Sequence, residues 1–272
     1  MGHDKLRKFR ENETFRCLLQ PDTASLLAHP EEGGFALSHH PVRGKWNGEM
    51  FASAQPIVLE LGCGKGEYTI DLALRRPDVN YIGVDIKGAR LWKGAKFAEE
   101  HGLPNAAFLR TRIEFIEAFF APGEVSEIWL TFSDPQIKKE NNRLTSPGFL
   151  ARYRNFLKPG GIVHLKTDSR FLHEYSKAVA EENGLEILAC TEDLYGRGEE
   201  DMEKSALASV CGGDAVRSLF EVRTFYEKMF LAKGLKITYL SFRIDHEGDY
   251  LSPSSFDNDY WRAWDKESGS TQ

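Results

Sequence analysis

Five nearly continuous apolar runs, separated by stretches of helical period, constrain this chain more than any other feature. They cover residues 57–63, 81–86, 106–111, 127–134 and 161–168, and two further runs follow at 185–191 and 237–244. Such runs are typical of strands that are covered on both faces of a parallel sheet. The stretches at 67–75, 89–100, 113–120, 147–156, 170–181 and 218–232 predict helices. We therefore predict an α/β fold with helices on both faces of a mostly parallel sheet.

Composition divides the 272 residues into three parts. Residues 1–50 are polar and predict an N-terminal arm with little regular structure, whereas residues 51–245 carry the strand and helix patterns of one large domain. Residues 192–217 interrupt that domain as a long insertion, a feature that is usually functional or mobile. Residues 246–272 form an acidic tail in which Trp261 and Trp264 are candidate anchors.

Several classes of protein are excluded by simple counts. An apolar share of 41% is enough for a core, so the chain is not disordered over most of its length. No window approaches the roughly 18 apolar residues needed to cross a bilayer, and residues 1–16 lack the apolar segment of a secretory signal. The four cysteines form no CxxC pair, which argues against a metal site and against disulfides. We expect a cytoplasmic protein without a membrane or metal partner; the sequence does not give its oligomeric state.

The net charge of −6 hides an uneven distribution. Residues 138–170 carry eight Lys or Arg and two acids, a net of +6, whereas residues 181–203 have a net of −8 and residues 245–272 a net of −5. Phosphates respond to local potential, so a basic face that binds nucleic acid is compatible with an acidic total. Chance clustering of surface charge explains the pattern equally well, and charge alone does not decide between them.

A glycine loop follows the first predicted strand. The segment Ile57–Glu67 reads IVLELGCGKGE, in which Gly62, Gly64 and Gly66 follow G-x-G-x-G and not the dinucleotide pattern G-x-G-x-x-G. Glu60 precedes the loop, where a carboxylate disfavours a pyrophosphate and favours a cationic ligand. Asp85 ends the second strand, where an acid can accept both hydroxyls of a ribose. Together they suit S-adenosylmethionine, although a bare tight turn is the simpler alternative.

The fourth strand ends in a second candidate site, Thr131–Lys139, which reads TFSDPQIKK. Strand ends of this kind line the ligand crevice of open parallel sheets, so we expect Asp134 to face a methyl donor and its acceptor. Guanine N7 carries a free lone pair, so methyl transfer to it needs alignment and a suitable field more than a strong base. A carboxylate that accepts the N1 and N2 protons would select guanine. Alternatively, Asp134 only caps the Asp-Pro turn.

At these motifs the sequence resembles the class I S-adenosylmethionine-dependent methyltransferases over about residues 55–245, and more closely the bacterial-type tRNA (guanine-N7)-methyltransferases. The closer resemblance rests on FSDP at 132–135, KK at 138–139, RLT at 143–145, KTD at 166–168 and TFYEKMF at 224–230. It implies a seven-stranded Rossmann-like sheet and methylation of a guanine in the variable loop of tRNA. The implied methyl donor is S-adenosylmethionine, and the implied partner is tRNA.

The resemblance also assigns residues to two sites. It places the donor at Glu60, Gly62, Gly64, Asp85, Arg112 and Asp134, with Asp134 also catalytic. It places the tRNA guanosine at Lys138, Asp168, Thr224, Phe225, Tyr226 and Glu227. Independently of the family, Lys138 follows the proposed catalytic strand end, where a nucleotide phosphate would approach; a solvated turn is the alternative. Thr224 and Glu227 also fit a capping box at the start of a helix.

The chain departs from the family pattern in three places. Gln136 stands where an aromatic residue usually follows the Asp-Pro pair, and Asn141 and Asn142 thin the basic cluster downstream. Arg112 replaces an acid in the loop after the third strand, so we expect that loop to hold adenine through backbone groups and apolar contact. We expect these departures to affect the contacts with tRNA more than the methyl-transfer chemistry.

Two other functions remain open at this point. A small-molecule methyltransferase would use the same donor loop but would not need the basic stretch, and the acidic total is its best support. A non-catalytic RNA-binding module on the same fold is the other, and the intact Glu60, Asp85 and Asp134 count against it. Loss of tRNA binding as salt rises would favour either RNA function.

Overall fold

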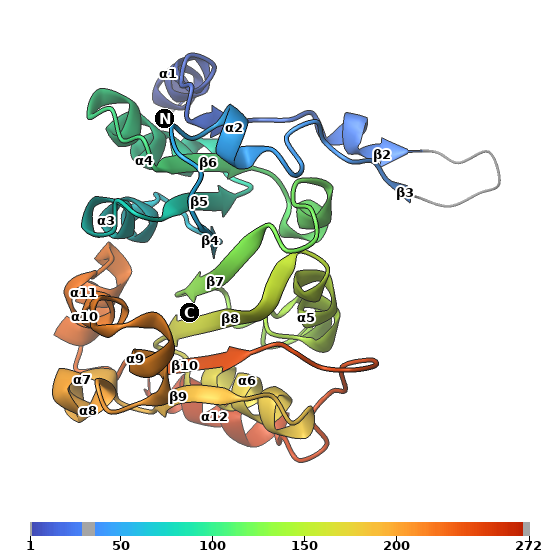
Figure 1. Cartoon of the computed structure of the whole chain (residues 1–272). Helices are drawn as coiled ribbons and strands as arrows, with labels where there is room; N and C mark the ends of the chain where they lie inside the picture. The colour runs from blue at the N-terminus through green and yellow to red at the C-terminus, as the bar shows by residue number, and fades with distance from the viewer. Residues whose placement is uncertain (1, 29–35, 269–272) are drawn as a thin grey trace. The chain divides into compact units, whose positions relative to one another are not determined.

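The computed structural model of the chain describes residues 2–28 and 36–268, in two compact units. The first unit comprises residues up to Ile128 together with Asn155–Lys158, and the second comprises Trp129–Arg154 and the residues from Pro159 onward. Strands and helices alternate through most of the described chain, as predicted (Figure 1). No helix within the described ranges is long and apolar enough to cross a membrane.

In the first unit, four parallel strands lie in the order β1 (Leu18–Leu19), β6 (Ala106–Arg110), β5 (Asn80–Asp85) and β4 (Ile57–Leu61). The register aligns Glu60 with Gly83 and Asp85 with Arg110. All five residues of β4 and all six of β5 are buried, which explains why both strands read as continuous apolar runs.

The helices of this unit are α1 (Gly2–Asn12), α2 (Trp46–Glu49), α3 (Glu67–Arg75) and α4 (Gly88–Glu100), with 3₁₀ turns η1 (Thr23–Leu26) and η2 (Ile113–Ala118). A two-stranded sheet pairs β2 (Leu27–Ala28) with β3 (Ala36–Leu37). Helix α1 packs against α4, where Asn12 donates to the Gly88 carbonyl oxygen at 2.9 Å (Figure 1). The expectation of little regular structure in residues 1–50 is therefore wrong for α1, because packing on α4 stabilises a helix that is polar overall.

In the second unit, the strand order is β7 (Val125–Thr131), β8 (Leu157–Thr167), β10 (Thr238–Arg243) and β9 (Ile187–Thr191), and β10 runs antiparallel to both β8 and β9. Strands β7 and β8 each begin in residues of the first unit. Between and after these strands lie η3 (Glu140–Asn142), α5 (Pro147–Arg154), α6 (Arg170–Glu182), α7 (Leu194–Arg197), α8 (Glu199–Met202), α9 (Ala206–Cys211), α10 (Gly213–Glu221), α11 (Phe225–Ala232) and α12 (Asn258–Ser268).

The predicted α/β class with a mostly parallel sheet is confirmed, with eight strands in the main sheet instead of seven. All seven predicted strands are present within a few residues of their expected bounds, and β1 is the addition. The stretch at 218–232 forms two helices, α10 and α11, because Val222 and Thr224 have extended backbones. The insertion at 192–217 holds short helices in which Leu194, Met202 and Leu207 are buried, so it is a packed segment and not an extended loop.

Candidate active site: a glycine loop and an aspartate at a strand end

The glycine loop of the first unit joins β4 to α3. Gly62, Gly64 and Gly66 all have positive φ angles, of 79°, 57° and 70°. A Cβ added at Gly62 or at Gly64 would meet no atom within 4 Å, whereas a Cβ at Gly66 would lie 2.5 Å from Phe108. The first two glycines therefore present bare backbone to open space, as a site for a close ligand requires. Gly66 instead allows close packing of the loop against β6.

Asp85 and Glu60, the two carboxylates predicted to contact the methyl donor, stabilise this loop through hydrogen bonds. Asp85 accepts hydrogen bonds from the Gly64 N–H at 3.0 Å and from the Lys87 N–H at 2.7 Å. Glu60, which is 4% exposed, accepts from the backbone N–H of Thr69 at 2.9 Å and from its hydroxyl. The acids thus connect the loop to the start of α4 and to the first turns of α3. This network holds the loop in shape before any ligand binds.

The structure brings Glu60, Gly62, Gly64 and Asp85 together, but it gives Arg112 a different environment. The Arg112 side chain is exposed, pairs with Glu114 at 3.3 Å and lies 5.8 Å from the ring centre of Phe115. Cys63, in the middle of the loop, is buried, and this burial raises the pKa of its thiol well above the usual value. Burial and a raised pKa are typical of a cysteine that packs in the interior rather than of a reactive thiolate.

The end of strand β7, in the second unit, has an unusual backbone around Asp134. Phe132 and Gln136 have φ angles of 50° and 48°, and among the described residues they alone combine a positive φ with a side chain. Such conformations cost of order 1–3 kcal/mol each and gather at functional sites. Asp134 is exposed between them, and its Oδ1 accepts from the Gln136 N–H at 2.9 Å. The turn-capping role considered from the sequence is therefore real, and it leaves the carboxylate at the surface.

Asp134 and Asp168 follow neighbouring strands. The Phe132 N–H donates to the Lys166 carbonyl oxygen at 2.9 Å, so each aspartate lies two residues beyond this pairing. Lys138 and Lys139 are exposed in the segment after Asp134. The second unit thus brings Asp134, Asp168 and an exposed cationic pair to the carboxyl ends of β7 and β8, where ligands bind in sheets of this type.

Arg143 holds the segment after Asp134, a role that sequence reasoning missed. Its side chain is almost fully buried, lies 4.2 Å from the ring centre of Tyr175 and donates to the Ile137 carbonyl oxygen at 3.2 Å. It also donates to Asn258 at the start of α12 at 3.0 Å. Burial lowers the pKa of the guanidinium, against the opposing influence of Tyr175 and Glu140. Arg143 therefore connects the segment after Asp134 to α6 and α12.

The predicted block Thr224–Glu227 forms the first turn of α11. Thr224 caps the helix by accepting from the Glu227 N–H at 3.2 Å, while Phe225 and Tyr226 are 57% and 47% exposed. Glu227 is fully buried and pairs with Lys166 of β8 at 2.7 Å, and it accepts from the Tyr195 hydroxyl at 2.6 Å. Only the Thr224 half of the capping box is present, since the Glu227 carboxylate points into this ion pair.

The Lys166–Glu227 ion pair lies in the interior of the second unit, with both side chains fully buried. Lys166 also donates to the carbonyl oxygens of Leu219 and Val222, at 2.6 and 3.2 Å. Burial lowers the pKa of Lys166 to about 8, although Glu227 opposes the shift. The lysine thus joins the end of α10 and the start of α11 to the carboxyl end of β8. Because these segments are distant in the chain, only the KTD and TFYE motifs marked them in the sequence.

Comparison with known proteins connects these features to a family. Residues 54–206 match a family model described as "Putative methyltransferase". The chain is 44% identical to a tRNA (guanine-N(7)-)-methyltransferase of Bacteroides thetaiotaomicron, over 98% of this chain and 96% of that protein. Proteins of the same name from Christiangramia forsetii and Porphyromonas gingivalis are 47% and 44% identical, over 89% and 93% of this chain and 98% and 96% of theirs. The chain therefore belongs to the tRNA (guanine-N(7)-)-methyltransferase family.

Proposed function

We propose that this protein transfers the methyl group of S-adenosylmethionine to N7 of a guanine in the variable loop of tRNA. The observation that carries the proposal is the exposed Asp134, held between two strained residues at the end of β7 and followed by the exposed Lys138 and Lys139. An unstrained turn at this place would make the fold more stable. Strained backbone of this kind therefore favours a functional role for the segment. The family relationship supports the same assignment.

The residues of the first unit fit the methyl donor. Gly62 and Gly64 offer open backbone, and Asp85 lies at the strand end where an acid can bind ribose hydroxyls. When bound, S-adenosylmethionine supplies an activated methyl group on a positively charged sulfur. The acidic surroundings, Glu60 and Asp85, favour such a cationic ligand over one that carries phosphates. We place the adenine near η2 through backbone groups and apolar contact, and Arg112 contributes through its backbone.

The residues of the second unit fit the acceptor. The N7 lone pair of guanine forms the new carbon–nitrogen bond as the carbon–sulfur bond breaks, and the sulfur leaves with that electron pair as a neutral thioether. No proton needs to be removed, and the positive charge passes to the guanine ring. The Asp134 carboxylate accepts hydrogen bonds from the N1–H and N2–H groups of guanine and stabilises the developing positive charge. Lys138 binds a phosphate of the same strand.

The remaining predicted residues orient the RNA. Asp168 and the exposed Phe225 and Tyr226 contact the guanosine, and Thr224 fixes the first turn of α11. We assign Glu227 a positioning role, because its carboxylate pairs with Lys166 in the interior. In this role it would set the place of Phe225 and Tyr226 relative to the end of β8.

The test is to incubate the protein with labelled S-adenosylmethionine and an unmodified tRNA transcript and then map the methylated base. We expect label at N7 of one variable-loop guanine. A matched transcript with 7-deazaguanine at that position has a carbon in place of N7 and should accept no label. Label that persists on the 7-deaza transcript, or that appears only on small molecules, would contradict the proposal.

A further inference from the structure

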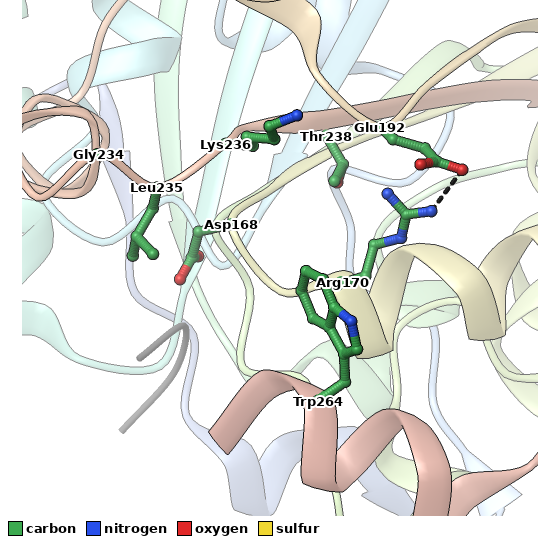
Figure 2. Close-up of a pocket in the computed structure, with 8 residues that line it drawn as sticks. All are labelled: Asp168, Arg170, Glu192, Gly234, Leu235, Lys236, Thr238 and Trp264. Atoms are coloured by element: carbon green, nitrogen blue, oxygen red, sulfur yellow. Dashed lines mark ion pairs between the residues drawn. The ribbon is translucent and has the colours of Figure 1, made fainter. Parts of the chain in front are cut away.

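A pocket of about 270 Å³ in the second unit is lined by one predicted substrate residue and by side chains that the proposed reaction does not involve (Figure 2). Its volume is just below the roughly 300 Å³ at which sites for small ligands begin. Asp168 is the predicted residue among its walls. The others are Arg170, Glu192, Gly234, Leu235, Lys236, Thr238 and Trp264.

Helix α12 is fixed at this pocket by one buried acid. Asp265 is fully buried, and it accepts hydrogen bonds from the Phe171 N–H at 2.9 Å and from the Ser169 hydroxyl. These donors belong to the N-terminus of α6, where a carboxylate is stabilised by unpaired N–H groups. Ser169 directly follows Asp168, so the neighbouring Trp264 is placed on a rigid element beside Asp168.

Trp264 remains 42% exposed although α12 is firmly docked. Its indole lines the pocket, and its ring centre lies 6.3 Å from that of Trp261. The Arg170 guanidinium lies over the Trp261 ring, 5.6 Å from the ring centre. A large aromatic ring that is held on one side and open on the other is the usual platform for stacking a nucleobase.

The charges of the pocket favour a base over a phosphate. Its two cations already have acidic partners: Arg170 pairs with Glu174 at 2.8 Å and with Glu192, and Lys236 pairs with Asp193 at 3.2 Å. A phosphate would therefore find no uncompensated cation on the described walls. A base edge with N–H donors would instead find the carboxylate of Asp168, and its flat face would find Trp264.

We propose that Trp264 stacks on a nucleobase of the substrate RNA in this pocket, with the base edge toward Asp168. The inference rests on the proposed function and adds a positioning residue to it, supplied by the acidic tail. The base belongs to the methylated guanosine or to a neighbouring nucleotide, and both offer the same chemistry to an indole.

The experiment compares tRNA affinity, measured with a fluorescently labelled unmodified transcript, in Trp264→Leu, Trp264→Phe and Tyr260→Leu. Leucine keeps apolar contact but loses stacking, so we expect Kd to rise about fivefold or more, the scale of one base–aromatic stack. Phenylalanine retains a ring and should stay within about threefold of the wild type, since stacking tolerates ring replacement. Tyr260 is also an exposed aromatic residue of α12, at 57%, but it does not line the pocket, so its variant should bind as the wild type does.

Tryptophan fluorescence gives a second readout that does not depend on the leucine variant folding. Binding of tRNA should quench part of the wild-type emission, and Trp264→Phe should lose that part. A transcript made abasic at the mapped guanosine then identifies the base: loss of quenching assigns the target guanosine, and retained quenching assigns a neighbour. Unchanged affinity in Trp264→Leu, or unchanged quenching in Trp264→Phe, would overturn the inference. Failure of the wild type to methylate tRNA would instead contradict the proposed function.

Discussion

The glycine loop of the first unit and the Asp134 strand end of the second unit are built in opposite ways. The loop obtains its positive φ angles from Gly62, Gly64 and Gly66. Its two acids accept from backbone groups nine and 21 residues away, all within the continuous segment from β4 to β5. The strand end instead holds Phe132 and Gln136 in the same backbone region at a cost. A donor site can thus be preorganised by local sequence, whereas this acceptor site depends on distant contacts to hold a strained segment.

Those distant contacts come from buried cations. Arg143 connects the segment after Asp134 to α6 and α12, and Lys166 connects β8 to α10 and α11 through Glu227. Buried ion pairs contribute little net stability, but removal of one partner leaves an uncompensated charge. The acceptor region should therefore be sensitive to substitutions far from the substrate, and the donor region should not.

The largest expected effect comes from Lys166→Met, which leaves Glu227 buried without its cation. We expect a loss of about 3–5 kcal/mol in the free energy of unfolding. The double variant Lys166→Met/Glu227→Met removes both charges and should recover much of that loss. Denaturant unfolding of the two single variants and the double variant measures this coupling, and additive losses would show that the pair is not a unit.

Asp134→Ala should lower kcat about a hundredfold to a thousandfold, the scale of removing one preorganised electrostatic group. Binding of S-adenosylmethionine should remain measurable, because Gly62, Gly64 and Asp85 are intact. Single-turnover methylation of tRNA and calorimetry with the donor separate the two quantities. Turnover close to that of the wild type would remove Asp134 from the chemistry.

The glycines allow a matched pair of substitutions within the donor loop. Gly66→Ala meets Phe108 and takes a positive φ, so we expect it to lower the free energy of unfolding by at least about 2 kcal/mol. Gly64→Ala meets open space and should cost about 1–2 kcal/mol through φ alone. Its main effect should be weaker binding of the methyl donor, because the new methyl group fills the open space beside the loop where we place that ligand. If Gly64→Ala bound the methyl donor as the wild type does, the proposed position of the donor at the glycine loop would be wrong.

The smallest expected effect is that of Lys138→Ala, which removes one exposed charge. We expect tRNA affinity to fall a few-fold and the slope of log Kd against log salt to decrease by about 1, as for one lost phosphate contact. Donor affinity should not change. Lys45→Ala, another exposed lysine, serves as the control. Equal losses of tRNA and donor affinity would contradict the assigned role.

The same contrast explains what could be predicted from the sequence. Strand β4, the glycine loop and helix α3 were predicted almost to the residue, because apolar runs, glycines and caps act locally. The two-residue strand β1 has no periodicity to detect, and its pairing with β6 comes from tertiary contact. The burial of Lys166 and Arg143 was not predictable, since composition favours exposed cations and their partners lie far along the chain.

The tail shows a similar limit. Trp261 and Trp264 were the expected anchors, because large aromatic side chains are usually buried. Trp261 does contact α6, through Arg170 at 5.6 Å, but the residue that α12 buries is Asp265, while Trp264 stays open to the pocket. The role of Asp265 depends on its position next to the N-terminus of α6, and the sequence does not show which helix the tail packs against.

The central claim is that the first unit holds the methyl donor independently of the acceptor residues. Calorimetric titration with S-adenosylhomocysteine, the demethylated product, tests it most directly. We predict saturable heat for the wild type and for Asp134→Ala, and a much weaker response for Gly64→Ala. Absence of heat with the wild type, or equal binding by Gly64→Ala and the wild type, would contradict the account.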